Sequence, residues 1–154
     1  LANSQYFNQR FEQEFKRAIR EKNNIALIVV NIDEFDAYND LYGRAEGDDC
    51  LKKIAQTLLK QCNRPSDLVS RVDSDEFYLL LPNTTDPQMV AKRCASSIDY
   101  LQIAHDNSVR ASILSVSVGV SSSLPDENTK ISELVSQAKE ALMFAKNSGR
   151  SRVV

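Results

Sequence analysis

An unbroken apolar run at residues 25–30 places the strongest constraint on how this 154-residue chain can fold. The run, Ile-Ala-Leu-Ile-Val-Val, has no polar alternation, which is typical of a strand that is covered on both faces of a sheet. It ends in Asn31 and Asp33, and residues two apart on a strand point to the same face. The sequence therefore predicts a central strand with polar side chains gathered at one end.

A second acidic strand end lies at residues 71–77, Arg-Val-Asp-Ser-Asp-Glu-Phe, between strands predicted at 68–72 and 77–81. By itself, Asp-Ser-Asp is ordinary turn chemistry. Beside the first strand end, however, Asp75 and Glu76 can complete a divalent-metal site for phosphate chemistry. Mg²⁺ prefers hard oxygen ligands and shares its coordination shell with phosphates and water.

Helices are predicted wherever apolar residues recur at helical spacing. These segments are residues 4–22, a short helix that follows Asp33 and ends near Gly43, a helix that opens after Gly47-Asp48, and residues 87–104 and 131–147. Residues 114–120 alternate between apolar and small polar side chains, which indicates a strand. After the opening helix, the order βααββαβα with a short final strand indicates an α+β fold with helices packed on the sheet.

Composition limits the class of protein. A content of 42% hydrophobic and 26% charged residues is ordinary for one soluble globular domain, here residues 1–154. The net charge of −2 provides no basic field for nucleic acid or an anionic membrane. No apolar run approaches the roughly 18 residues of a membrane-spanning helix, and no signal peptide is present, so a cytoplasmic location is expected.

The rarer residues carry less information. Cys50, Cys62 and Cys94 fall at apolar helical positions without metal-ligand spacing, which predicts reduced core thiols. His105, the sole histidine, is expected to be a surface or capping residue at a helix end rather than a catalyst. A start at Leu1 without methionine suggests a domain excised from a longer signalling protein.

Five segments carry a resemblance that covers nearly the whole chain. They are Asn3-Ser-Gln-Tyr-Phe7, Val30 to Asp48 (V-N-I-D-E-F-D-A-Y-N-D-L-Y-G-R-A-E-G-D), Asp73-Ser-Asp-Glu-Phe77, Val116-Ser-Val-Gly-Val120, and Ala141 to Arg150 (A-L-M-F-A-K-N-S-G-R). In this order they resemble the signatures of GGDEF domains, the diguanylate cyclase family. The resemblance implies a palm-like, mostly antiparallel sheet and a role in bacterial cyclic di-GMP signalling. It also implies a homodimer in which two GTP molecules are condensed with Mg²⁺.

The same resemblance assigns the catalytic edge, where the chain departs from the family. It implies metal binding by Asn31, the carbonyl of Ile32, and Asp75, with Asp33 and Glu76 as further family acids. Asn31 has lost the charge that the family carries there, Asp73 and Ser74 replace both glycines, and Asp36 stands in place of a lysine. One carboxylate about 5 Å from a phosphate charge costs roughly 3 kcal/mol at an effective dielectric constant near 20. We therefore expect the triphosphate to bind weakly or in an unreactive pose.

Other positions of the family persist. Asn39 and Asp48 match the residues that bind the guanine edge, and Lys146 and Arg150 match the residues at the phosphates. The alternative role for the two basic residues is compensation of a helix dipole. Arg64-Pro-Ser-Asp67 matches the R-x-x-D inhibitory site for cyclic di-GMP, although any R-x-x-D can also be a plain helix-to-strand connection.

Three hypotheses remain open. The first, which we favour, is a catalytically impaired module that binds GTP or cyclic di-GMP and regulates a neighbour such as an EAL domain or an upstream sensor. The second is an active diguanylate cyclase. The third is a protein-interaction scaffold without ligands. Asn31 and Asp73-Ser74 argue against the second hypothesis, and the persistence of Arg64 and Asn39 argues against the third.

Overall fold

A computed structural model describes residues 1–106 and 113–154 and confirms the predicted order of elements. Its helices and strands are α1 (Ser4–Glu21), β1 (Ile25–Ile32), α2 (Phe35–Tyr42), α3 (Arg44–Gln61), β2 (Leu68–Asp73), β3 (Glu76–Pro82), α4 (Pro87–Tyr100), β4 (Val116–Ser123) and α5 (Ile131–Asn147). None of these helices in the described part of the chain is long and apolar enough to cross a membrane.

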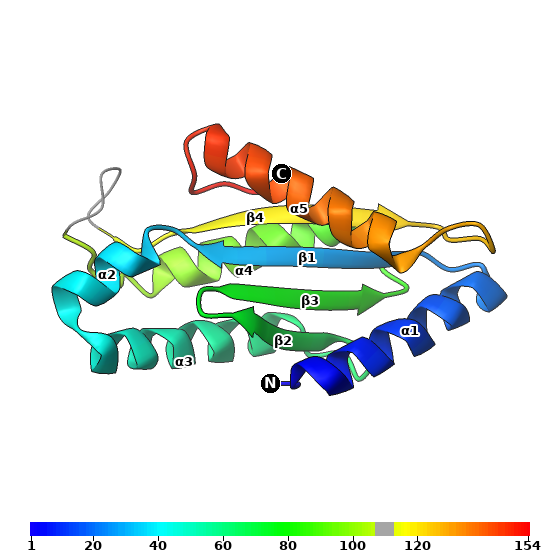
Figure 1. The fold of residues 1–154 in the computed structure, drawn as a ribbon, viewed down its shortest axis with the longest axis horizontal. Coiled ribbons are helices and arrows are strands. Elements are labelled where there is room, and N and C mark those ends of the chain that lie inside the picture. Colours follow the sequence, from blue (N-terminus) through cyan, green and yellow to red (C-terminus); the bar gives the residue numbers. More distant parts are fainter. Residues whose placement is uncertain (107–112) are drawn as a thin grey trace.

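The sheet has the strand order β2-β3-β1-β4, and every neighbouring pair is antiparallel. Helices α1 and α5 lie on one face, and α3 and α4 lie on the other (Figure 1). All eight residues of β1 are buried, as the apolar run predicts for a central strand. The fold is thus an α+β sandwich of three layers with β1 in the middle.

The two faces of β1 enter different cores. Ala26, Ile28 and Val30 pack with α3 and α4, whereas Ile25, Leu27 and Val29 pack with α1 and α5. Because side chains alternate along a strand, Asn31 belongs to the α1/α5 face. The polar end of β1 is therefore presented to α5 rather than to α3.

Three predicted boundaries are wrong. Helix α3 begins at Arg44, before Gly47-Asp48, because its first turns are polar and give no apolar signal. Helix α4 ends at Tyr100 rather than at residue 104, and Gln102 just beyond it has a left-handed backbone (φ 52°) that cannot continue a helix. Strand β4 begins at Val116, and the expected final strand is reduced to one parallel bridge between Val118 and Val153.

The prediction for His105 is also wrong, because its side chain is only 1% exposed. Its Nε2 lies 3.0 Å from the Glu34 carbonyl oxygen, and its ring meets Tyr38 edge-on with centroids 5.3 Å apart. These partners come from the turn before α2 and from α2 itself, so no local sequence pattern announces them. The three cysteines are free and buried, as predicted.

Candidate functional site

A row of polar side chains crosses three strands at the acidic edge of the sheet. Asn31 on β1 is paired in register with Glu76 on β3 and with Ser117 on β4. All three residues lie on the face that α5 covers, because their strand neighbours alternate with the opposite core. Asn31 is 5% exposed, so a neutral amide occupies the centre of the row.

Asp33 follows directly after this row, and its carboxylate is engaged inside the protein. Its Oδ1 accepts a hydrogen bond of 2.6 Å from the Ser117 hydroxyl, and its Oδ2 accepts one of 2.7 Å from the Ser115 hydroxyl. The Ser151 backbone N–H also donates to Oδ2 at 3.1 Å. Asp33 thus anchors β4 and the C-terminal segment to the end of β1.

Glu76 is half-buried, and burial raises the pKa of its carboxyl group. Lys139 and Lys146 on α5 oppose this shift, whereas the neighbouring Asp75 and Asp73 reinforce it. The Asp75 carbonyl oxygen accepts a 2.9 Å hydrogen bond from the Ile32 N–H, which docks the hairpin onto the end of β1. The fold therefore brings Asp75, Glu76 and Asn31 to one edge, as the sequence predicts.

The hairpin tip forms without the two glycines of the family motif. None of residues 73–76 has a positive φ, so Asp73 and Ser74 need no conformation that favours glycine. The Ser74 N–H donates to the Asp73 carboxylate at 2.7 Å, and the Arg71 Nε–H donates to the Asp73 carbonyl at 3.1 Å. The turn is stabilised locally, and the added acid at Asp73 stays exposed beside the edge.

The residues at this edge do not fit a two-magnesium site. Asn31 supplies an oxygen but no negative charge, and the Asp33 carboxylate already accepts three protein hydrogen bonds. Burial raises the pKa of the Glu76 carboxyl group, which weakens its preference for the charged form that a hard cation needs.

Asn39, on α2, has an unsatisfied acceptor. Its Oδ1 is buried and has no hydrogen-bond partner among the described residues. A Cβ atom added at Gly47 would collide with this same oxygen, so the missing side chain of Gly47 makes room for the Asn39 carboxamide. A buried acceptor without a partner costs free energy, which a ligand N–H can recover.

Asp48 follows Gly47 on α3 and lines a cavity of about 240 Å³. Leu51 and Phe77 supply apolar wall, and Lys52 and Arg71 supply positive charge at the same cavity. An apolar slot with one carboxylate and nearby cations suits a flat base that is attached to an anion. Sequence reasoning missed Lys52 and Arg71, because only the packing of α3 against the hairpin brings them together.

Lys146 and Arg150 lie at the end of α5. Lys146 is in the last turn of the helix, and its charge acts on Glu76. Arg150 follows the helix with a left-handed backbone, φ 62°. Both positions agree with the phosphate role and with the dipole role, and the end of α5 adjoins the acidic edge.

Arg64 and Asp67 form a closed clasp. The Arg64 guanidinium contacts the Asp67 carboxylate through Nη2 at 2.7 Å and through Nε at 3.1 Å. It also donates to the Pro82 carbonyl at 2.9 Å, to the Thr84 hydroxyl at 2.6 Å, and weakly to the Asn83 carbonyl at 3.4 Å. The Asp67 side chain is 4% exposed, so this pair ties the α3–β2 turn to the end of β3.

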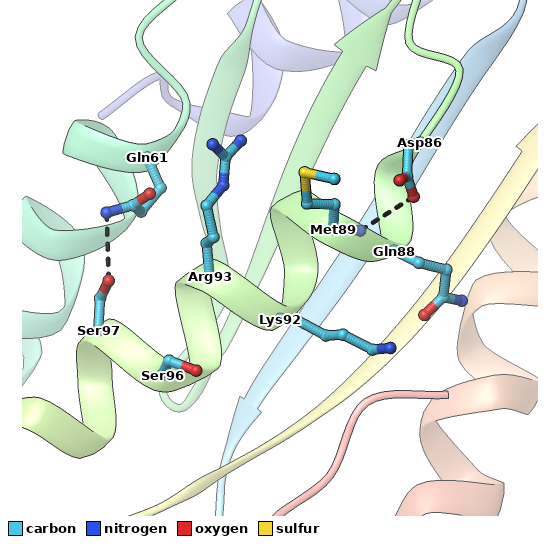
Figure 2. A pocket seen from close by; sticks show the side chains of 8 residues that line it. All are labelled: Gln61, Asp86, Gln88, Met89, Lys92, Arg93, Ser96 and Ser97. Atoms are coloured by element: carbon cyan, nitrogen blue, oxygen red, sulfur yellow. Dashed lines mark hydrogen bonds between the residues drawn. The ribbon is translucent and has the colours of Figure 1, made fainter.

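Arg93, on α4, is a further basic residue that sequence reasoning missed. It lines a cavity of about 200 Å³ together with Arg64 and Asp67. It also borders a second cavity of about 480 Å³ along α4, in which Gln61 donates a 3.1 Å hydrogen bond to Ser97 (Figure 2). In Figure 2, Arg93 and Lys92 extend in different directions from α4, and of these two residues only Arg93 lines both cavities.

The three-layer palm-like fold and the acidic hairpin edge define the class of protein, and the comparisons give the family. The family model described as "Diguanylate cyclase, GGDEF domain" matches residues 1–152. The chain belongs to this family of cyclic di-GMP signalling domains. The recognition made from the five sequence segments is therefore confirmed.

Relatives and solved structures agree. Diguanylate cyclase DgcM of Escherichia coli is 38% identical over 129 residues, which cover 84% of this chain and 30% of that protein. The diguanylate cyclase SiaD of Pseudomonas aeruginosa, solved with its activator SiaC, has a TM-score of 0.85 at 30% identity, covering 100% of this chain and 58% of that one. The GGDEF domain of DgcB from Caulobacter crescentus, solved with c-di-GMP, has a TM-score of 0.87 at 22% identity, covering 100% and 90%.

The chain spans 35% and 30% of the length of two of its curated relatives, Diguanylate cyclase A of Treponema denticola and DgcM. What those proteins do as a whole is a separate matter from what this domain does. The comparisons thus establish the fold and the family of this domain.

Proposed function

We propose that this GGDEF domain binds GTP as a regulatory ligand in cyclic di-GMP signalling and is impaired as a cyclase. The observation that carries this proposal is the contrast between two parts of one site. Asn39 offers a buried, unpartnered acceptor near Asp48, whereas a neutral Asn31 occupies the centre of the edge that faces the triphosphate in the family. The groups that recognise the guanine base are kept, whereas the groups that offset the charge of the triphosphate are weakened.

The guanine part of the proposal rests on hydrogen-bond complementarity. Guanine presents an N1–H and an exocyclic amino group on one edge, and both need acceptors. The Asn39 Oδ1 and the Asp48 carboxylate are acceptors, and adenine, whose N1 is itself an acceptor, cannot satisfy them in the same way. A site that leaves a buried polar group unpaired with the wrong base discriminates strongly against it.

The impaired turnover follows from electrostatics. Nucleotidyl transfer depends on groups that offset the charge developing on the phosphates, and these are largely metal ions held by carboxylates. Here Asp33 is committed to Ser115 and Ser117, and burial shifts Glu76 toward protonation. The exposed Asp73 adds repulsion at the same edge. We infer that bound GTP is held mainly through its base, with Lys146 and Arg150 at the phosphates.

A second ligand, cyclic di-GMP, is favoured by one observation at the R-x-x-D site. Arg93 faces the same cavity as Arg64 and Asp67, so two guanidinium groups and one carboxylate line it. A guanidinium can pair with O6 and N7 of guanine, and a carboxylate can accept from the guanine N–H groups. The Arg64 guanidinium would first have to leave its contacts with residues 82–84.

Calorimetry with product analysis tests the proposal. The chain is titrated with GTP, ATP and cyclic di-GMP in buffer with Mg²⁺, and the GTP sample is then examined by chromatography. We expect GTP binding without ATP binding, and no accumulation of cyclic di-GMP. Asn39→Ala should weaken GTP binding about tenfold or more, the value of a buried hydrogen bond left unmade, whereas Asn8→Ala on the exposed face of α1 should not.

The alternatives correspond to other outcomes of the same experiment. Robust synthesis of cyclic di-GMP would show an active cyclase. The absence of binding heat with both GTP and cyclic di-GMP would favour a scaffold that acts through protein contacts. In the proposed role, ligand occupancy is communicated to a neighbouring domain, such as an EAL domain or a sensor.

A further inference from the structure

A buried carboxylate on α1 has no role in the nucleotide site. Glu14 lies on the inner face of α1, among Phe7, Phe11, Phe15 and Ala18, and is 6% exposed. Its Oε2 is buried and has no hydrogen-bond partner within the described part of the chain. An isolated carboxylate in such a place is costly unless a donor or a cation meets it.

Within the described residues, Arg17 is the cation that pairs with Glu14, and it does not satisfy this carboxylate. Arg17 places its Nη1 3.6 Å from Oε1, which is beyond hydrogen-bond distance. Its Nε instead donates to Glu21 at 2.7 Å, and 59% of the Arg17 side chain is exposed. The carboxylates of Glu14 and Glu21 thus share one guanidinium, so the three groups together carry a net charge of about −1.

This group borders a cavity of about 300 Å³ at the junction of α1 with two loops. Pro65 and Ser66, from the turn between Arg64 and Asp67, form one wall, and Pro82 and Asn83 form another. The two prolines offer apolar surface for a methylene stem, and Ser66 and Asn83 offer polar atoms at the rim. The volume lies at the lower end of the range for ligand pockets.

We propose that this cavity binds a singly charged guanidinium or ammonium group, with Glu14 as the partner of its charge. One such cation neutralises the excess charge of Glu14, Glu21 and Arg17, and its N–H supplies the donor that Oε2 lacks. The same chemistry can come from a free organic cation or from an arginine or lysine side chain of a protein partner. The site is separate from the guanine pocket and does not depend on nucleotide binding.

An NMR titration of the ¹⁵N-labelled chain tests the proposal. The probes are methylguanidinium chloride and the peptide acetyl-Gly-Arg-Gly-amide. The citrulline peptide of the same shape and sodium chloride at equal ionic strength serve as controls. We expect saturable shifts of the Asn23, Ser66 and Asn83 amides with both cations and with neither control. Tighter binding of the peptide would identify a side chain as the natural source, and equal or tighter binding of methylguanidinium would identify a free cation.

Three variants assign the effect to Glu14. Glu14→Gln keeps the shape and removes the charge, and it should weaken binding about tenfold or more, the value of one charge-assisted hydrogen bond. Glu12→Gln, an exposed position on the same helix, should leave binding unchanged. Arg17→Gln alters only an exposed side chain and removes the competing cation, so it should tighten binding severalfold.

Two results would overturn the proposal. One is the absence of saturable shifts at the cavity amides with either cation. The other is equal affinity in wild type, Glu14→Gln and Arg17→Gln. Because Arg17→Gln changes no buried group, this variant tests the idea even if Glu14→Gln fails to fold.

Discussion

At Gly119 on β4, backbone atoms of α5 lie directly against the strand, and Gly119→Ala should destabilise the domain substantially. A Cβ atom there would collide with the Ala138 carbonyl oxygen and the Leu142 nitrogen, and it would lie 2.9 Å from the Leu142 Cα. These are backbone atoms of a helix, so no rotamer change can relieve the overlap. Either α5 moves outward or β4 bends, and the buried side chains Leu134, Ala138 and Leu142 lose contact with the sheet.

The expected loss can be worked from these contacts. Overpacking a core costs about 1–3 kcal/mol, and backbone overlap places this case near 3 kcal/mol. The lower entropy of unfolded alanine returns about 0.4–1 kcal/mol. The net loss is about 2 kcal/mol, which corresponds to a fall in Tm of roughly 4–8 °C for a domain of this size.

Thermal and urea unfolding followed by circular dichroism measure this loss. Ser122→Thr adds a methyl group at an exposed position of the same strand and should change the free energy of unfolding by less than about 0.5 kcal/mol. If Gly119→Ala unfolds at the wild-type midpoint, then α5 is not seated on Gly119, and its placement of Lys146 near Glu76 is also in error.

Three further predictions concern the site. Gly47→Ala should weaken GTP binding about tenfold by calorimetry while leaving the circular dichroism melt unchanged, because the added Cβ displaces only the tip of Asn39; unchanged affinity would show that this amide does not contact the base. Glu76→Gln should stabilise the domain at neutral pH. Burial raises the pKa of Glu76 in the folded state above its unfolded value. The stability that proton binding by Glu76 contributes is therefore present at pH values below the unfolded pKa and is lost as the pH rises through the folded pKa. The difference in unfolding free energy between this variant and wild type should therefore be largest near pH 7 and vanish near pH 4, and a constant difference across this range would contradict the assignment. Finally, Asn31→Asp combined with Asp73→Gly and Ser74→Gly should tighten GTP binding in Mg²⁺ and raise any cyclase activity, and an unchanged GTP affinity would refute the charge argument.

The sequence predicted the central strand and the element order well, because each rests on a local pattern. Residues 25–30 are buried on both faces as their unbroken apolar run requires, and Asn31 comes to lie beside Glu76. The start of α3 was missed because residues 44–49 hold no large apolar side chain and therefore give no helical periodicity. His105 was misjudged because its partners, Glu34 and Tyr38, lie about seventy residues earlier in the chain.

The site shows the same division. Residue type and motif spacing identified Asp33, Asn39, Arg64 and Asp67 as candidate site residues. They did not reveal which of the polar atoms already have hydrogen-bond partners within the protein. The hydroxyls that hold Asp33 come from Ser117 on β4 and from Ser115 just before it, more than eighty residues away, and the Pro82 carbonyl that accepts from Arg64 lies at the end of β3. Such long-range hydrogen bonds leave no periodic signal. These hydrogen bonds nevertheless make Asp33 an anchor, whereas the buried Asn39 Oδ1 has no partner among the described residues.

The Arg64 clasp has a mechanical consequence. The Arg64 guanidinium joins the turn that follows α3 to the residues that lead from β3 into α4. Whatever draws that side chain outward breaks the hydrogen bonds at both ends together, whereas the Gln61–Ser97 hydrogen bond and the shared core still hold α4 against α3. A ligand that engaged Arg64 would therefore separate the α3–β2 turn from the connection between β3 and α4, on the side of the sheet opposite α5, while the two helices stayed packed.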